Sequence, residues 1–263
     1  MKSYGAIWLA ILFPLGCPAD VVTRTPTPPS ERAGQAKVAG KEAERQYRQG
    51  VQYAEGDGVP QDYVRAAQFY RLAAEKGLSA AQYDLGYLYE TGKGVPRDFK
   101  QAAIWYRKAA LQGDPEAQNN LGVLCATGKG VTRSDAEAIH WYRLAAAQND
   151  PEATSNLGSM YLQGRAVKRD FEQAFNLFQK AAERGYAIAQ NNLALMYANG
   201  QAVARDYVWA YAWLDLAATQ IQASAQLREK VAKEMTADEI ARARDLAARK
   251  RLELNHKGEE SKR

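Results

Sequence analysis

Apolar residues recur along this chain at two spacings, a short one of four residues and a long one of 36. The short spacing is clear where Ala81, Leu85 and Tyr89 follow one another, and it predicts an α-helix with one buried face. The long spacing predicts stacked helical units that bury their cores against their neighbours. It is marked by one residue in each unit, namely Gly50, Gly86, Gly122 and Gly158, with Ala194 in the next place.

Each period predicts two helices. In the copy 114–149 the first helix begins at Asp114-Pro115 and ends near Gly128. The second helix places Trp141 and Tyr142 among alanines, a pattern typical of closely packed helix pairs. Across the units its start is marked by Asp62, Asp98, Ser134, Asp170 and Asp206, and its end by Gly77, Gly113, Asn149 and Gly185. These residue types cap helices, and Ser134 with Glu137 predicts a capping box, so we interpret them as structural.

The recurring glycine falls in the middle of the first helix of each unit. Glycine there is less favourable than alanine by about 1 kcal/mol, so another interaction is expected to offset it. Close approach of the partner helix is the expected compensation. Ala194 then predicts a slightly wider helix crossing in the fifth unit.

These residues resemble a known repeat. The segment Leu85 to Ala110 reads LGYLYETGKGVPRDFKQAAIWYRKAA, which is similar to the Sel-one-like repeat, a short-period relative of the tetratricopeptide repeat. The resemblance extends over residues 43 to 221 in five units, at 43–77, 79–113, 115–149, 151–185 and 187–221. Ala166 and Ala202 replace the second loop glycine and Cys125 replaces a tyrosine, and none of these is expected to disturb the fold.

The resemblance implies an all-α fold, a right-handed α/α superhelix or solenoid of antiparallel helix pairs. It also implies adaptor or scaffold roles without a shared reaction. After the fifth unit the pattern changes, which predicts C-terminal capping helices over 222–254 and a charged tail over 255–263. Thr236 and Glu239 predict a capping box at the start of the last helix.

The first residues have the build of a secretory leader, with a short apolar run from Tyr4 to Leu15. Two processing routes fit a signal peptide over 1–19. Leu15-Gly16-Cys17 resembles a bacterial lipobox that ends at residue 16 and leaves Cys17 for lipid attachment, although Pro14 stands where that pattern has an aliphatic residue. Ordinary cleavage after Ala19 is the alternative. Residues 20–40 are rich in proline and threonine and predict an unpacked linker.

Charge and cysteine content narrow the function further. The formal net charge is +5 and cations and acids are interspersed, which disfavours nucleic-acid binding. Once Cys17 is lipidated or removed, Cys125 is the remaining cysteine, and we interpret it as a buried, inert side chain. Secreted relatives described as penicillin-binding or β-lactamase-like carry a cysteine pair in each unit, so their activity is not carried over.

Candidate chemistry is sparse in this sequence. His140 occupies a column of varied residues and His256 lies in the charged tail, so neither predicts a catalytic role. Gly128-Lys129-Gly130-Val131 is similar to a phosphate-binding loop but lacks its spacing and the serine or threonine after lysine. No catalytic set, metal site or cofactor is therefore predicted.

A binding surface remains as the candidate site. With the buried stripe facing inward, two columns of the first helices are expected to face outward, and the resemblance places them on the concave side. Their members are Tyr83, Asn119, Ser155 and Asn191 in one column and Tyr87, Val123, Ser159 and Leu195 in the other. Exposed aromatic and aliphatic side chains ringed by amides would suit a protein or peptide, although single exposed apolar residues are ordinary. Asn120, Asn156 and Asn192, which follow Asp84, are expected to form hydrogen bonds between units.

The sequence thus predicts an exported, monomeric, non-enzymatic scaffold of the cell envelope. It is expected to be periplasmic or lipid-anchored, with secretion as a further route, and to bind a protein or peptide. Membrane association is expected only through Cys17. The alternative is a cell-wall hydrolase or penicillin-binding activity.

Overall fold

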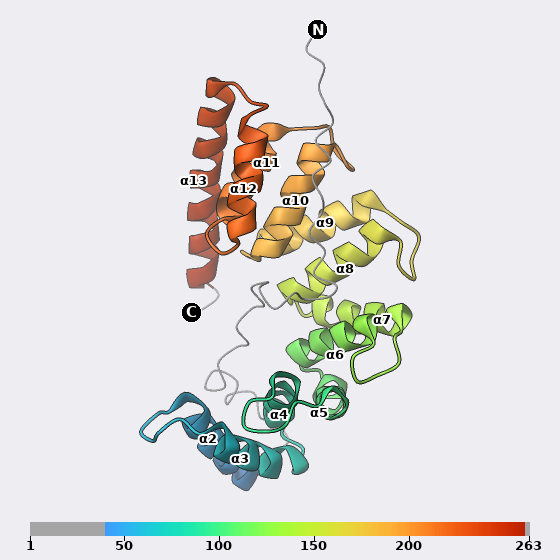
Figure 1. Ribbon diagram of the computed structural model, residues 1–263, viewed down its shortest axis with the longest axis vertical. Coiled ribbons are helices and arrows are strands. Elements are labelled where there is room, and N and C mark those ends of the chain that lie inside the picture. The colour runs from blue at the N-terminus through green and yellow to red at the C-terminus, as the bar shows by residue number, and fades with distance from the viewer. Residues whose placement is uncertain (1–39, 261–263) are drawn as a thin grey trace. The chain divides into compact units, whose positions relative to one another are not determined.

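The computed structural model describes residues 40–260 of the chain (Figure 1). This part contains twelve α-helices and no strand, which confirms the predicted all-α class. The predicted leader with Cys17, and the linker up to residue 39, lie outside the described residues.

The helices follow one another as hairpins. Their bounds are α2 Lys41–Glu55 with α3 Tyr63–Glu75, α4 Ser79–Thr91 with α5 Phe99–Leu111, α6 Pro115–Thr127 with α7 Asp135–Ala147, α8 Pro151–Gln163 with α9 Phe171–Ala182, and α10 Ala187–Asn199 with α11 Tyr207–Ala217, followed by α12 Gln222–Ala232 and α13 Ala237–Glu260. Two compact units divide the described chain. The N-terminal unit (residues 40–150) holds α2 to α7 and the C-terminal unit (residues 151–260) holds α8 to α13.

The helix ends use the predicted capping residues. The Asp62 carboxylate accepts hydrogen bonds from the backbone N–H groups of Val64 and Arg65 at 2.9 and 3.0 Å. Ser134 accepts from the backbone N–H of Glu137 at 3.2 Å. The reciprocal half of the predicted capping box is absent, because the Ser134 N–H donates to the Cys125 carbonyl and the Glu137 carboxylate accepts from Arg107. Asn149 adopts a left-handed conformation (φ 68°), as predicted for a residue in the place of glycine.

The recurring mid-helix glycine is explained by the partner helix. A Cβ on Gly86 would lie 2.8 Å from the ring of Tyr106, and Gly50, Gly122 and Gly158 meet Tyr70, Tyr142 and Phe178 in the same way. This confirms the predicted close approach.

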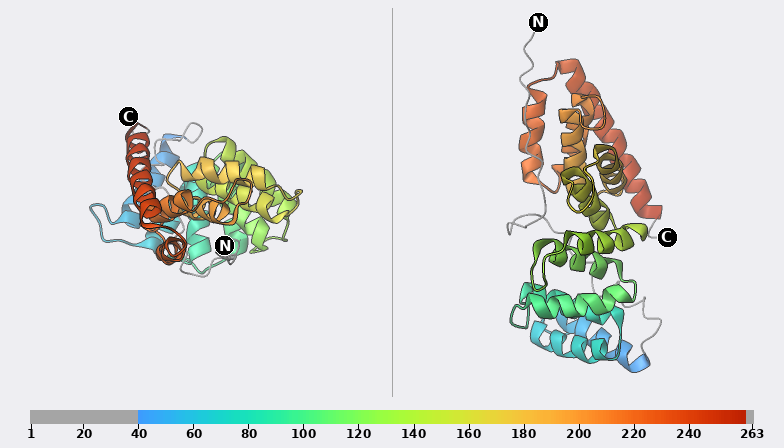
Figure 2. Two further views of the ribbon diagram at one scale, coloured as in Figure 1. Left: turned by 90° about the horizontal axis from the view of Figure 1, so that it is seen from above. Right: turned by 90° about the vertical axis from the view of Figure 1, so that its right-hand side faces the viewer.

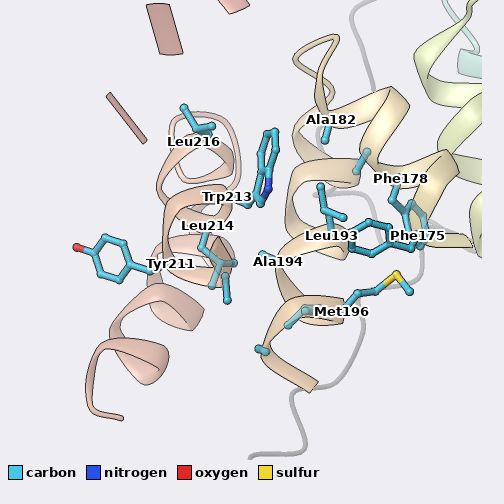
Figure 3. Packing of buried hydrophobic residues seen from close by; sticks show 14 of the residues in the cluster. Phe175, Phe178, Ala182, Leu193, Ala194, Met196, Tyr211, Trp213, Leu214 and Leu216 are labelled. Carbon is cyan, nitrogen blue, oxygen red and sulfur yellow. The ribbon is translucent and has the colours of Figure 1, made fainter. Parts of the chain in front are cut away.

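The fifth unit changes both members of this contact. Ala194 stands in the glycine column and Leu214 in the aromatic one, and both are fully buried in the core of the C-terminal unit (Figure 3). Leucine is smaller than the aromatic residue of the other units and alanine is larger than their glycine, so the total volume of the pair stays similar. The wider crossing predicted from Ala194 alone stays a prediction.

The last two helices complete the C-terminal unit by packing on α11 (Figures 1 and 2). The predicted capping box is present, because the Thr236 N–H donates to Glu239 at 2.8 Å and the Glu239 N–H donates to Thr236 Oγ1 at 3.3 Å. Asp215 on α11 accepts hydrogen bonds from Arg228 of α12 at 2.6 Å and from Arg251 of α13 at 3.0 Å. The helix continues to Glu260, past the start of the predicted tail at residue 255.

Candidate protein-binding surface

The columns predicted to face outward on the first helices are largely buried, so that expectation is wrong. Tyr87 and Val123 are half-buried. The buried members, with their exposed fractions, are Tyr83 (3%), Asn119 (2%), Ser155 (0%), Ser159 (0%), Asn191 (1%) and Leu195 (0%).

The cause is the packing of the first helices. Each of α4, α6 and α10 contacts the second helix before it as well as the second helix of its own hairpin. Two covered sides leave these helices no broad solvent-facing surface. The binding roles of Tyr87 and Val123 stay predictions.

The polar column beside these residues forms hydrogen bonds between successive hairpins, as predicted. Tyr47 donates its hydroxyl to Asp84 Oδ2 at 2.7 Å, and Asn120 Nδ2 donates to Tyr83 Oη at 3.5 Å. The pattern fails at Asn192, whose buried amide has no hydrogen-bond partner at either atom within residues 40–260. The hydrogen-bonding position that Tyr47 and Tyr83 occupy in the first two hairpins is held by Ser155 in the fourth. The serine side chain is too short to reach the next hairpin as a tyrosine hydroxyl does.

Exposed large hydrophobic residues occur instead on the second helices of the N-terminal unit. We call them the outer apolar set; its members and exposed fractions are Val64 (55%) and Leu72 (45%) on α3, Ile104 (46%) and Leu111 (73%) on α5, and Leu144 (39%) on α7. Leu252 on α13, at 61%, is the one further exposed large hydrophobic residue in the described part of the chain. Five of the six exposed large hydrophobic residues in the described part of the chain therefore lie on the second helices of the N-terminal unit.

The repeat register shows that this set shares one side of the second helix. Val64 begins a column at 64, 100 and 136, Ile104 belongs to the column at 68, 104 and 140, and Leu72 and Leu144 belong to the column at 72, 108 and 144. Positions four apart along a helix lie on one face, so we call these three columns the outer columns. Leu111 lies seven residues after Ile104 and extends the same face of α5.

Cationic side chains accompany the outer apolar set. The helix α5 contains Lys100, Arg107 and Lys108 and no acidic residue. Lys108 lies with its ammonium group 3.8 Å from the centre of the Trp105 ring, a cation–π contact that holds the charge at the surface. On α3, Arg71 donates to the Tyr89 hydroxyl at 2.7 Å. This face therefore combines aliphatic area with positive charge.

Arg107 is the member of this basic group that is neutralised within the unit. It donates to Glu137 at 2.7 Å, and this hydrogen bond holds the pKa of the Glu137 carboxyl below its usual range. The exposed lysines at 100 and 108 have no comparable acid on α5.

Cys125 is buried, as predicted for an inert side chain. Loss of solvation, together with the charge of Glu137, raises the pKa of its thiol to about 11. The thiol therefore stays protonated near neutral pH and is a poor nucleophile.

The glycine-lysine-glycine loop is a helix connection, as predicted. It joins α6 to α7, and a Cβ on Gly130 would collide with the backbone of Phe99 at 2.2 Å. Lys129 lies over the Phe99 ring with its ammonium group 5.4 Å from the ring centre. Both contacts fix the loop to the preceding hairpin and leave the loop glycines a structural role.

Residues 40–260 contain no helix that is both long and apolar enough to cross a bilayer. The His, Cys, Asp and Glu side chains in that part of the chain form no group of three that could hold a metal ion.

The five helical hairpins match a known repeat family. A family model for the Sel1 repeat matches residues 44–78, 79–114, 115–150, 151–186 and 187–220. Among curated proteins, none matches this chain.

Three solved structures are similar to the chain. A Sel1 repeat protein from Oxalobacter formigenes is 36% identical, with a TM-score of 0.66, and the match covers 67% of this chain and 70% of that one. The c5321 protein, described as a protective antigen present in uropathogenic Escherichia coli strains, is 32% identical with a TM-score of 0.54; the match covers 81% of this chain and 54% of that one, so it spans about half of the larger protein. The immunity protein Pa5087 from Pseudomonas aeruginosa, 22% identical with a TM-score of 0.50 over 86% of this chain and 85% of that one, shares the fold.

Proposed function

This chain belongs to the Sel1 repeat family, whose members are generally protein-interaction scaffolds and typically not enzymes, and on that premise we propose that it binds another protein through the second helices of its N-terminal unit. The observation that carries this proposal is the outer apolar set on α3, α5 and α7. Aliphatic side chains left in water lose the free energy that burial provides, about 25 cal/mol for each Å². A partner that covers them recovers it.

The proposal moves the binding surface from the first helices to the second. Burial of Tyr83, Asn119 and Leu195 removes them from contact with a rigidly docked partner. Ile104 and Leu111, by contrast, are accessible without any rearrangement.

We further propose that the protein acts in the cell envelope. The support is the leader-like segment 1–19, with its apolar run and the small residues around Cys17. Mass spectrometry of the mature N-terminus tests this. A lipid-modified Cys17 identifies an anchored protein, an N-terminus at Asp20 identifies a soluble exported one, and an intact Met1 in purified protein from the native cell contradicts export.

The binding role is tested by chemical cross-linking in intact cells that express the tagged full chain, followed by identification of the captured proteins. The matched variants are Leu72→Ser/Ile104→Ser/Leu144→Ser on the outer columns and Asn176→Ser on α9. A specific partner is expected with the wild type and with Asn176→Ser and is expected to be lost from the triple variant. Capture that is unchanged in a folded triple variant would contradict the proposed surface.

A further inference from the structure

In the C-terminal unit, other helices of the same chain cover the outer columns of one second helix. The inference that we draw from this cover deepens the proposed function and rests on it. In the outer columns, α11 carries Val208, Ala212 and Leu216. Ala212 is 1% exposed and Leu216 is 5% exposed, whereas Gln68, Ile104 and His140 in the column of Ala212 are exposed. Both α12 and α13 pack on α11, and α13 is the longer of the two.

The covering helix α13 is amphipathic and makes its contact through small residues. Ala243 and Ala247, four residues apart, are 0% and 1% exposed. Ile240 and Leu254 on the same helix pack against the core of the unit while staying partly exposed. Small residues at this spacing let two helices approach closely, and the flanking aliphatics add buried area.

Polar contacts fix the register of α13. Arg251 donates to Asp215 on α11 at 3.0 Å, and Arg244 donates to the Tyr211 hydroxyl at 3.5 Å. Helix α13 therefore contributes cationic side chains that pair with the acidic Asp215 of α11.

The second helix α9 provides an internal comparison. Its residues in the outer columns are Glu172, Asn176 and Lys180, and all three are exposed. A second helix whose outer columns face solvent thus carries polar residues there, and one that is covered by a helix carries apolar residues. In the N-terminal unit these columns hold four exposed aliphatic residues, Val64, Leu72, Ile104 and Leu144, which resemble those of the covered α11. The same columns also hold exposed polar residues, namely Gln68, Lys100, Lys108 and His140.

We propose that the outer columns of α3, α5 and α7 bind an amphipathic α-helix of a partner protein, one that presents small and aliphatic residues four apart and acidic residues beside them. The aliphatic requirement follows from the outer apolar set. The requirement for a helix follows from the packing of α12 and α13 on α11, where Ala212 and Leu216 of the outer columns are buried.

The acidic requirement follows from a reversal of charge. In the repeat register, Arg71, Arg107 and Arg143 stand where α11 has Asp215, and of these Arg107 is already paired with Glu137. Lys100 and Lys108 add exposed cations within the outer columns of α5. A second copy of α13 would bring Arg244 and Arg251 towards these cations, so like-charge repulsion disfavours it as the occupant.

The probe is a synthetic 20-residue peptide with alanine and leucine on one helical face and glutamate elsewhere, labelled with a fluorophore. Its binding to the full chain is followed by fluorescence anisotropy. A scrambled peptide of the same composition keeps the net charge but lacks the apolar face. A peptide with lysine in place of glutamate keeps the apolar face but reverses the charge. The glutamate peptide is expected to bind at least about tenfold more tightly than either control.

Matched variants locate the binding site. Leu72→Ser/Ile104→Ser/Leu144→Ser is expected to weaken binding about tenfold, and Asn176→Ser on α9 is expected to leave it within about twofold. Reversal of charge by Lys100→Glu/Lys108→Glu is expected to shift preference from the glutamate peptide to the lysine peptide. Circular dichroism checks that each variant keeps its helical content.

Two results would overturn the inference. One is equal binding of the glutamate and scrambled peptides, and the other is unchanged affinity in the folded triple variant. Either outcome leaves the scaffold role intact if cross-linking in cells still captures a partner that depends on the outer columns. Loss of that capture as well would contradict the proposed function itself.

Discussion

At the scale of single residues, the glycine column and the aromatic column form one packing unit. Gly158 approaches Phe178 so closely that an added Cβ would lie 3.0 Å from the ring. The fifth unit solves the same packing with Ala194 and Leu214. The pair, and not either residue alone, is therefore the element that the repeat preserves.

Gly158→Ala is expected to lower the free energy of unfolding by about 1 kcal/mol, because overpacking of about 2 kcal/mol outweighs a gain in helix propensity of about 1 kcal/mol. The double variant Gly158→Ala/Phe178→Leu copies the fifth unit and is expected to be more stable than the sum of the two single effects by about 1 kcal/mol. Urea unfolding of the full chain measures both. Strict additivity would contradict the pairing.

The two loop alanines hold a conformation that favours glycine. Ala202 has φ 65° and Ala166 has φ 52°. Ala202→Gly is expected to stabilise the protein by about 1 kcal/mol, because a left-handed backbone is unfavourable for a residue with a Cβ. Ala204→Gly in the same loop, where φ is not positive, is the control and is expected to be neutral or slightly destabilising. A raised unfolding midpoint for Ala204→Gly alone would contradict this reasoning.

Glu90 gives the protein a pH-dependent contact. Burial raises the pKa of its carboxyl, while the hydrogen bond from the Tyr106 hydroxyl at 2.6 Å opposes that rise. The folded state then binds its proton more tightly than the unfolded state does. Stability from this group therefore increases as the pH falls through the raised pKa and decreases as the pH rises.

The matched variant is Glu90→Gln, which keeps an acceptor for Tyr106 but cannot ionise. Relative to this variant, the wild type is expected to gain stability as the pH is lowered from 7 towards 5. Urea unfolding at several pH values measures the difference. A wild type that loses stability relative to Glu90→Gln over that range would show that the carboxylate is favoured by folding.

At the scale of helices, the packing of the C-terminal capping helices α12 and α13 on α11 depends on one carboxylate. Asp215 accepts from Arg228 and Arg251, and its side chain is 22% exposed. Asp215→Ala is expected to destabilise the C-terminal unit by about 1–2 kcal/mol after allowance for solvent screening. Hydrogen exchange is expected to accelerate more in α12 and α13 than in α9.

The control for this prediction is Glu229→Ala. Glu229 pairs with Arg228 at 3.0 Å, but its side chain is 65% exposed, so the change is expected to stay within about 0.5 kcal/mol. Equal effects of the two variants would mean that Asp215 does not hold the cap.

The helices could be predicted from the sequence because their signals are local. Caps such as Asp62 and Asn149, and the stripe at Ala81 and Leu85, depend on neighbours within one hairpin. The candidate site could not be predicted in the same way. A stripe shows that one face of a helix is buried, but whether a residue such as Tyr83 faces water depends on helices from neighbouring hairpins.

The register did contain one usable signal for the site. Equivalent positions on the second helices change from aliphatic at Leu72 and Leu144 to charged at Lys180. A column that must stay buried would not tolerate that change, so it marks a surface whose neighbours differ from one hairpin to the next.

At the scale of the molecule, the two compact units have different surfaces. In the C-terminal unit Ala212 and Leu216 in the outer columns of α11 are buried and Val208 is partly buried, whereas the outer columns of α9 are polar. In the N-terminal unit the corresponding columns hold exposed aliphatic residues beside lysine and arginine. We therefore place the proposed binding surface on the N-terminal unit, because its exposed aliphatic residues are the ones that a second protein would cover.

Site-specific photo-crosslinking in intact cells tests this claim most directly. A photoreactive amino acid is placed in the full chain at Ile104 on the outer columns of α5, at Asn176 on those of α9, or at Tyr87 on the first-helix face. We predict a discrete protein adduct from position 104 and none from position 176. Adducts from position 87 or 176 with none from position 104 would contradict the account.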